Sequence, residues 1–265
     1  MKKRLANLMG RDGKTFILAM DHAMLMDVGM KLKNPREIVA TAMTNGADAL
    51  LTTAGTAEYC MEQIGKSGLL IRTDCGTSAT HWCGKPFTNS YETASVEMAD
   101  RMGADGVINM LFTHMKSEDE EERTVARSAK TADLCDKYGM ALCVETVPGG
   151  FAYPENQTIE SIGFSSRLAC EMGADIVKSL FINDKEYKNR VIETCYRPLI
   201  VLGGGTAKTD KEILTDTKVA MDLGCKGVAY GRVVWNHKKL DKICQALAMI
   251  IHEDASVDQA LEVLK

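Results

Sequence analysis

One lysine lies near the end of a short apolar run, where its charge would be costly. The run extends from Ala174 to Phe181, directly after Gly173, and Lys178 is its basic residue. Such a run predicts a buried β-strand. Burying an ammonium is expensive unless it is paired, and the usual relief is loss of the proton. A neutral amine can attack a carbonyl, so Lys178 is the candidate nucleophile for Schiff-base chemistry. The alternative is a structural lysine that reaches solvent or pairs with a carboxylate.

Further polar residues stand in or at the ends of other strand-like runs. If those strands are parallel, their carboxyl ends meet at one face, where this arrangement places catalytic groups. Glu145 could be the proton shuttle of an iminium-forming lysine, or it could simply pair with Lys178. Asp21 is the second candidate acid–base group, and His22 could contact substrate or be a satisfied core imidazole. The whole set is Asp21, His22, Asp74, Asn109 and Glu145.

Two glycine clusters follow the last two strand-like runs. The first is Gly203-Gly204-Gly205, followed by Lys208, and the second is Gly231 with Arg232. Glycines let backbone N–H groups approach an anion closely, and arginine adds a fork suited to phosphate oxygens. We therefore expect Gly204, Gly205, Lys208, Gly231 and Arg232 to bind phosphate. The alternative is a pair of tight turns with solvated basic residues.

The elements that must position these residues form a repeat. A strand-like run recurs about every thirty residues with amphipathic segments between most of the runs, as in a series of βα units. Eight such units predict a single (β/α)8 barrel over residues 1–265, with short N-terminal and C-terminal extensions, rather than an open doubly wound sheet. The first run is not followed by G-x-G-x-x-G, which weakens a dinucleotide-binding alternative. The runs cover residues 15–20, 49–53, 69–74, 106–110, 141–145, 174–181, 199–203 and 227–230.

The helices of the repeat can be located from their boundaries. Asn34-Pro35 opens one helix, as expected of an N-cap followed by proline in the first turn. Glycines at 46, 103, 173 and 224 each precede a strand, which predicts a left-handed residue closing the helix before it. The clearest amphipathic segments cover residues 117–138, 161–171, 210–222 and 238–251.

Composition excludes several classes of function. The 265 residues carry a formal net charge of -4 with scattered basic residues, so nucleic acid is not an expected partner. No apolar stretch has the length of a membrane span, and the basic N-terminus lacks a signal-peptide core. Nine cysteines without a C-x-x-C pair indicate a reduced, cytoplasmic protein. The five histidines are dispersed, without H-E-x-x-H, so no metal site is expected.

These residues together resemble a known family. Phe16 to His22, Gly173 to Lys178, Gly203 to Thr209 and Gly231-Arg232 are similar to the class I aldolases of the DeoC/FbaB/LsrF family, which includes archaeal-type fructose-bisphosphate aldolase. The resemblance covers roughly residues 5 to 250. It implies a Schiff base on Lys178, an active-site role for Asp21, and phosphate binding by Gly204, Gly205, Gly231 and Arg232. It also implies that the covalent imine replaces any cofactor, and that the protein is a homo-oligomer.

One departure from the family pattern affects the expected chemistry. Archaeal-type members carry Tyr-Pro-Arg-Gly after strand five, whereas this chain has Val147-Pro148-Gly149-Gly150. The family tyrosine is missing, so the proton must be handled by Glu145, Asp21 or a water. We expect a metal-independent lyase that cleaves or forms a C–C bond in a phosphorylated or similarly anionic ketose. A transaldolase, an LsrF-type acyl transferase, a metal-dependent barrel aldolase and a non-catalytic sugar-phosphate-binding barrel are the alternatives.

Overall fold

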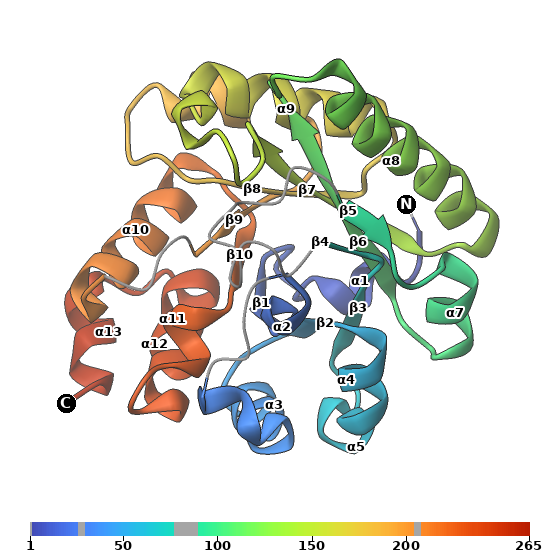
Figure 1. The fold of residues 1–265 in the computed structure, drawn as a ribbon. Coiled ribbons are helices and arrows are strands. Elements are labelled where there is room, and N and C mark those ends of the chain that lie inside the picture. Colours follow the sequence, from blue (N-terminus) through green and yellow to red (C-terminus); the bar gives the residue numbers. More distant parts are fainter. Residues whose placement is uncertain (1, 26–29, 77–89, 204–207) are drawn as a thin grey trace.

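Eight parallel strands close into a barrel in this computed structural model, and helices surround it (Figure 1). The structure describes residues 2–25, 30–76, 90–203 and 208–265. Around the barrel the strands follow the order β1-β10-β9-β8-β7-β6-β3-β2, which is chain order once the hairpin strands β4 and β5 are set aside. The predicted (β/α)8 barrel is thus confirmed. Its strands are β1 (Thr15–Ala19), β2 (Ala49–Thr52), β3 (Gly68–Arg72), β6 (Gly106–Thr113), β7 (Ala141–Pro148), β8 (Ile176–Ser179), β9 (Leu199–Leu202) and β10 (Gly227–Tyr230).

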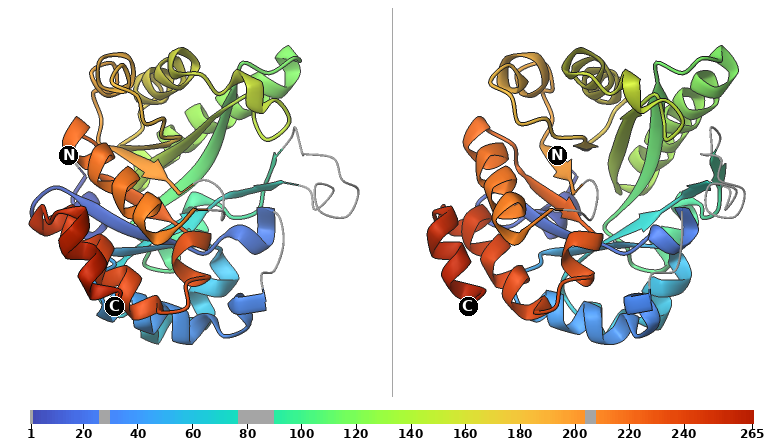
Figure 2. Two further views of the ribbon diagram at one scale, coloured as in Figure 1. Left: turned by 90° about the vertical axis from the view of Figure 1, so that its left-hand side faces the viewer. Right: turned by 60° about the vertical axis from the view of Figure 1, so that its left-hand side comes forward.

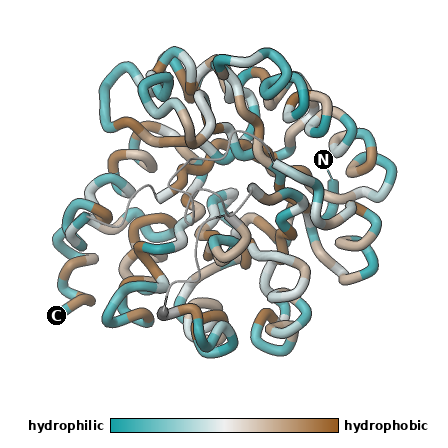
Figure 3. The backbone as a smooth tube through the Cα atoms, in the orientation of Figure 1, coloured by the Kyte–Doolittle hydropathy of each residue, from teal (hydrophilic) through white to brown (hydrophobic). Residues whose placement is uncertain are grey.

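The barrel strands form because their residues are apolar on both faces. All residues of β1, β2, β3, β6, β7, β8 and β10 are buried, as is usual for parallel strands covered by helices. The helices turn one apolar side toward the strands, and Figure 3 shows the resulting alternation of brown and teal around the barrel. The covering helices are α3 (Pro35–Thr44), α4 (Ala54–Tyr59), α5 (Met61–Ile64), α7 (Val96–Arg101), α8 (Glu118–Tyr138), α9 (Ile159–Glu171), α10 (Asp210–Leu223), α11 (Arg232–Trp235), α12 (Leu240–Glu253) and α13 (Val257–Val263).

The helix ends agree with the glycine prediction. Gly46, Gly103, Gly173 and Gly224 have φ values of 107°, 76°, 97° and 120°, which L side chains rarely adopt. Each lets the chain turn from a helix into the next strand, so the spacing of the repeat is set by these four residues.

Strand lengths differ from the prediction where two strands support each other. β6 and β7 continue to Thr113 and Pro148 because they pair in register over all eight residues. Phe112 and Val147 of these extensions form a small separate apolar cluster with Met110. The lysine strand ends earlier than predicted, at Ser179 instead of Phe181. The two long strands therefore raise one wall of the barrel above its neighbours.

The third strand also ends earlier than predicted, and a hairpin follows it. β3 stops at Arg72, and β4 (Asp74–Gly76) pairs antiparallel with β5 (Ser90–Glu92). The chain leaves the barrel here because the carboxylate of Asp74 accepts a hydrogen bond from the backbone N–H of Met110, 2.9 Å away. The polar side chain thus anchors the start of the hairpin to the neighbouring long strand.

The N-terminal segment covers the amino ends of the strands. Leu5 and Leu8 of α1 (Leu5–Leu8) join the apolar cluster inside the barrel. Asn7 donates a hydrogen bond to Asp105 Oδ1 at 2.7 Å, and Lys2 Nζ lies 2.9 Å from Asp175 Oδ2. In the left view of Figure 2 this segment lies at one end of the barrel and the β4–β5 hairpin at the other. The carboxyl ends of the strands are therefore the open face. No helix in the described ranges is long and apolar enough to span a membrane.

A histidine near the C-terminus fastens α12 to the start of β1. His252 Nδ1 lies 3.0 Å from Asp12 Oδ2, and its Nε2 lies 3.1 Å from Asp48 Oδ2. The hydrogen bond with Asp48 outweighs partial burial and, with Asp12, raises the pKa of His252 from 6.5 to about 9. A raised folded-state pKa contributes stability that is full below pH 6.5 and is lost as pH rises through about 9.

We therefore expect the stabilising effect of His252 to depend on pH. Wild type should be more stable than His252→Gln by about 2 kcal/mol near pH 6, allowing for screening of a partly exposed pair, and by much less near pH 10. Urea unfolding of both proteins at the two pH values measures the difference. An equal difference at both values would contradict the assigned role.

Candidate active site

Lys178, near the end of β8, lies against the carboxylate of Glu145, which stands in the middle of β7 and not at its end as predicted. Parallel pairing places Lys178 beside Glu145 in register, and Lys178 Nζ lies 2.7 Å from Glu145 Oε1. The lysine is only 4% exposed, so it does not reach bulk solvent. Of the two structural alternatives for this lysine, pairing with a carboxylate is the one observed. The pair lies at the wall of a cavity, where the amine can meet a substrate carbonyl.

Arg72, at the end of β3, connects three carboxylates and was not predicted as a site residue. Its side chain is fully buried. Arg72 Nε donates to Asp21 Oδ2 at 2.8 Å, Nη1 donates to Asp74 Oδ1 at 3.3 Å, and Nη2 donates to Glu145 Oε2. A planar guanidinium suits this forked arrangement. Arg72 therefore fixes the orientation of Glu145 so that its other oxygen faces Lys178.

The cations decide the protonation of the two inner carboxyl groups. Burial alone would raise the pKa of Asp21, but Arg72 and Lys178 outweigh it and lower the pKa to about 2. Burial likewise opposes ionisation of Glu145, and the charges of Lys178 and Arg72 hold its pKa below the ordinary value. Both groups are therefore carboxylates at neutral pH. They can accept a proton from a neighbouring group but do not hold one in this state.

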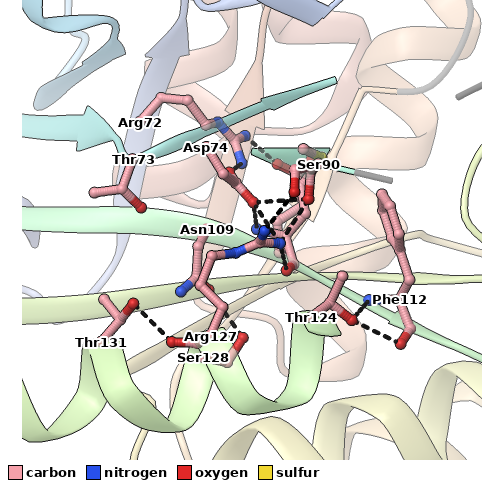
Figure 4. Close-up of polar contacts among 12 residues, drawn as sticks. Arg72, Thr73, Asp74, Ser90, Asn109, Phe112, Thr124, Arg127, Ser128 and Thr131 are labelled. Atoms are coloured by element: carbon pink, nitrogen blue, oxygen red, sulfur yellow. Dashed lines mark hydrogen bonds and ion pairs between the residues drawn. The ribbon is translucent and has the colours of Figure 1, made fainter. Parts of the chain in front are cut away.

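A second arginine extends the network toward the hairpin. Arg127 of α8 places Nη2 3.0 Å from Asp74 Oδ2 and donates through Nη1 to the carbonyl oxygen of Ser90 at 2.8 Å. Figure 4 shows Arg127 reaching from the helix to Asp74 and Ser90. Burial of Asp74 outweighs both arginines, and its pKa is raised. Asn109, another predicted strand-top residue, faces α8 instead and accepts a hydrogen bond from Ser128 at 3.2 Å.

The charges of this network balance. Three cations contact three carboxylates, so the sum is zero when all six groups are ionised. A proton that leaves the lysine can move to a neighbouring carboxylate without changing the charge of the buried cluster. The six residues are Lys178, Arg72 and Arg127 with Asp21, Glu145 and Asp74.

His22 lies beside the acidic residue that precedes it. Its Nδ1 is 3.7 Å from Asp21 Oδ1, and its ring packs edge-on against Trp235 with the centroids 5.6 Å apart. Burial, reinforced by nearby cations, outweighs Asp21 and lowers the pKa of His22, which favours the neutral imidazole. Glycine at 231 permits this position, because a Cβ there would lie 2.4 Å from Cε1 of His22.

Several of the residues named above line a cavity of about 230 Å³. The structure brings six predicted site residues to it: Lys178, Glu145, Asp21, His22, Gly231 and Arg232. Lys208 does not line it. Lys208 is paired with Asp216 of α10 and lines a neighbouring groove that shares Arg232. Gly204 and Gly205 lie outside the described residues. The remaining lining is mostly apolar: Ala19, Val147, Phe151, Gln157, Leu180, Leu202, Gly203, Ala229 and Val233.

Comparison with known proteins identifies the family. The model of the DeoC/LacD family aldolases matches residues 15–237. The chain belongs to this family. Among curated relatives, the 2-amino-3,7-dideoxy-D-threo-hept-6-ulosonate synthase of Halobacterium salinarum is 29% identical, with 96% of this chain and 93% of the relative covered. The class 1 fructose-bisphosphate aldolase of the same organism is 28% identical, and 95% of each chain is covered.

Solved structures agree with the family assignment. A structure of the Schiff-base-forming fructose-1,6-bisphosphate aldolase is 25% identical, with a TM-score of 0.83, and covers 95% of this chain and 99% of that chain. This family member is therefore a class I aldolase, an enzyme that works through a Schiff base, as its sequence predicts.

Proposed function

We propose that Lys178 is the lysine that forms the Schiff base. The observation that carries this proposal is its place in the cavity, 2.7 Å from Glu145 Oε1 and beside Asp21 and His22. Lys178 is the only lysine among the described lining residues, so a ketone in the cavity meets this amine. Asp21 and Glu145, both held by Arg72, are the proposed acid–base groups.

The proposed reaction uses these groups in turn. Lys178 transfers a proton to Glu145, and the free amine attacks the ketone. Glu145 returns this proton to the carbinolamine oxygen, which leaves as water. The resulting iminium accepts the electrons of the adjacent C–C bond when that bond breaks. Glu145 or Asp21 removes the hydroxyl proton that allows this cleavage, then returns a proton to the enamine. Water hydrolyses the final iminium and restores the lysine. Val147, at the position of the family tyrosine, cannot transfer a proton, so these carboxylates take that role.

The proposed substrate is a phosphorylated or similarly anionic ketose. Two residues directly after β10 suit an anion at the cavity. Arg232 supplies a guanidinium, and Gly231 has no side chain to keep an anion away from its backbone. Gly204 and Gly205 belong to the proposal on sequence grounds. Lys208 lies at the edge of the proposed phosphate site, because it lines the neighbouring groove that Arg232 also lines. Relatives act on fructose bisphosphate or make an aminodideoxyheptulosonate. Transfer of the enamine to a second aldehyde, or of an acyl group, would use the same lysine.

Trapping with borohydride tests the proposal. We expect borohydride with dihydroxyacetone phosphate to leave a stable adduct whose mass maps to the peptide containing Lys178. The exposed Lys185, in the loop after β8, gives a matched control: Lys185→Met should trap normally. An adduct on another lysine, or none with either dihydroxyacetone phosphate or fructose 1,6-bisphosphate, would refute the assignment of Lys178.

We further propose a cytoplasmic homo-oligomer that needs no metal or external cofactor. The eight cysteines within the described ranges are free thiols, which favours a reducing compartment. Exposed apolar side chains at Tyr59, Met61 and Met98 favour association with a second copy. Activity that survives a chelator and a sedimentation mass above one chain are the expected results.

A further inference from the structure

We infer that the substrate carries a single anionic group, and that the fragment released or added as an aldehyde is uncharged. This inference rests on the proposed function, because it takes Lys178 as the position of the substrate carbonyl. Charge is distributed unevenly over the cavity wall on the two sides of that lysine.

One side of the cavity carries charged groups among small and apolar residues. Going around the barrel from β8, this side comprises the ends of β9, β10 and β1. Beside apolar residues of these elements, it contains Arg232 and the backbone of Gly231, and then His22 and Asp21. The apolar residues are Ala19, Leu202, Ala229 and Val233. His22 Nδ1 is buried, lies 3.7 Å from Asp21 Oδ1 and has no hydrogen-bond partner among the described residues. An anionic group and its polar neighbours therefore belong on this side.

The other side of the lysine is apolar above Glu145. Val147 of β7 belongs to the cluster with Met110 and Phe112, and Phe151 packs edge-on against Phe112 with the centroids 6.0 Å apart. Leu180 continues the apolar surface after β8. These side chains are held by packing against the extended β6–β7 wall. The surface is therefore a fixed part of the cavity and suits a hydrocarbon fragment.

Cations are placed unevenly between the two sides. Of the described lining residues, those that can be positive are Lys178, His22 and Arg232, and none comes from β7 or the segment before α9. Lys116, after β6, is exposed and lies over the ring of Tyr153 and 3.9 Å from Glu155. A phosphate against Val147 and Phe151 would lose water without gaining a counter-ion from the described lining residues, which is unfavourable. The group at this end is therefore uncharged.

One uncharged polar group lies on the apolar side. Gln157 lines the cavity, and its Nε2 donates a hydrogen bond to the carbonyl oxygen of Gly150 at 3.2 Å. That bond orients the amide, and an amide recognises a neutral polar atom without favouring an anion. Gln157 is thus the position at which a change of charge should change substrate choice.

The step to be tested joins two probe compounds. Dihydroxyacetone phosphate condenses with Lys178 and releases water, and loss of a carbon-bound proton gives the enamine. The enamine carbon forms a bond to the carbonyl carbon of an aldehyde, whose oxygen takes up a proton. Water then cleaves the iminium and frees the lysine. The product is the one-to-one adduct of the two probes, and no oxidant or reductant is required.

Competing aldehydes give the first measurement. With dihydroxyacetone phosphate as donor, we expect kcat/KM for propanal to exceed that for glyceraldehyde 3-phosphate by about tenfold or more. A preference for glyceraldehyde 3-phosphate, in enzyme that still traps dihydroxyacetone phosphate, overturns the inference and leaves the proposed function intact. Failure to trap the donor at all overturns both.

A pair of variants gives the second measurement. Gln157→Arg adds a cation to the apolar side and should raise kcat/KM for glyceraldehyde 3-phosphate relative to propanal by about tenfold. Gln157→Met loses the same hydrogen bond to Gly150 without adding charge, and should leave the ratio near that of wild type. Borohydride trapping confirms that each variant has an intact lysine site. An unchanged ratio in a trapping-competent Gln157→Arg contradicts the placement of the aldehyde fragment.

Discussion

Lys178→Met is expected to abolish imine trapping and to lower aldol activity by roughly 10⁴-fold or more, because no other described side chain in the cavity can supply the amine. Methionine has similar length and fits the apolar surroundings of β8. Glu145 keeps its contact with Arg72, so the carboxylate is not left without a cation. Stability should therefore change little. Single-turnover trapping and thermal unfolding, measured on the same preparation, separate the two effects.

Lys178→Arg provides the control for charge. Arginine keeps a cation beside Glu145 but does not act as an amine nucleophile at accessible pH. We expect the Lys178→Arg variant to be nearly as stable as wild type and to form no imine that borohydride can trap. Substantial activity in either variant would show that another group carries the chemistry.

Arg72→Met is expected to damage both stability and catalysis. The substitution removes the cation shared by Asp21, Asp74 and Glu145 and leaves Asp21 without its hydrogen-bonded partner in the interior. Breaking a buried ion pair in this way costs about 3–5 kcal/mol, or roughly 10 °C in Tm for a chain of this size. The rate of imine formation should fall by about 10²-fold or more, since Glu145 loses the contact that orients it.

The pH dependence distinguishes a positioning role for Arg72 from a purely structural one. Arg72 contributes to the low pKa of about 2 at Asp21 and to the lowered pKa of Glu145. Without this arginine both values rise, so the acid limb of the pH–rate profile should move to higher pH. Arg72→Lys keeps the charge without the fork and should give a smaller movement. A variant that is merely less stable, with an unshifted profile, would contradict the positioning role.

The sequence predicted the parts of the fold that depend on local pattern. Buried runs gave the eight strands, and the glycines before them gave the helix ends. The extra length of β6 and β7 could not be predicted, because it arises from pairing between residues as distant as Thr113 and Pro148. The hairpin after β3 was missed for a similar reason, since Asp74 is held there by Met110 and Arg127 from other elements.

The residues of the candidate site also divide into those that a local sequence pattern predicts and those that depend on contacts between distant elements. Lys178 stood out as a charge within an apolar run, and the barrel placed Glu145 beside it. Arg72 ends an equally apolar run, Leu69-Leu70-Ile71, so the argument applied to Lys178 would have found it. Lys208 was predicted from its proximity to glycines, but the direction of its side chain toward Asp216 is decided by α10.

The contacts of Arg72 also bear on how the enzyme reaches its active form. Asp21 follows β1, and Arg72, Glu145 and Lys178 lie in β3, β7 and β8, so the four residues spread over more than half of the chain. Arg72 belongs to the first half, while Lys178 and Glu145 belong to the second. A folding intermediate made of the second half alone would carry the lysine and its carboxylate without the arginine that orients them. Chemical competence should therefore appear only when the two halves have docked, and reactivity toward ketones during refolding would report that late event.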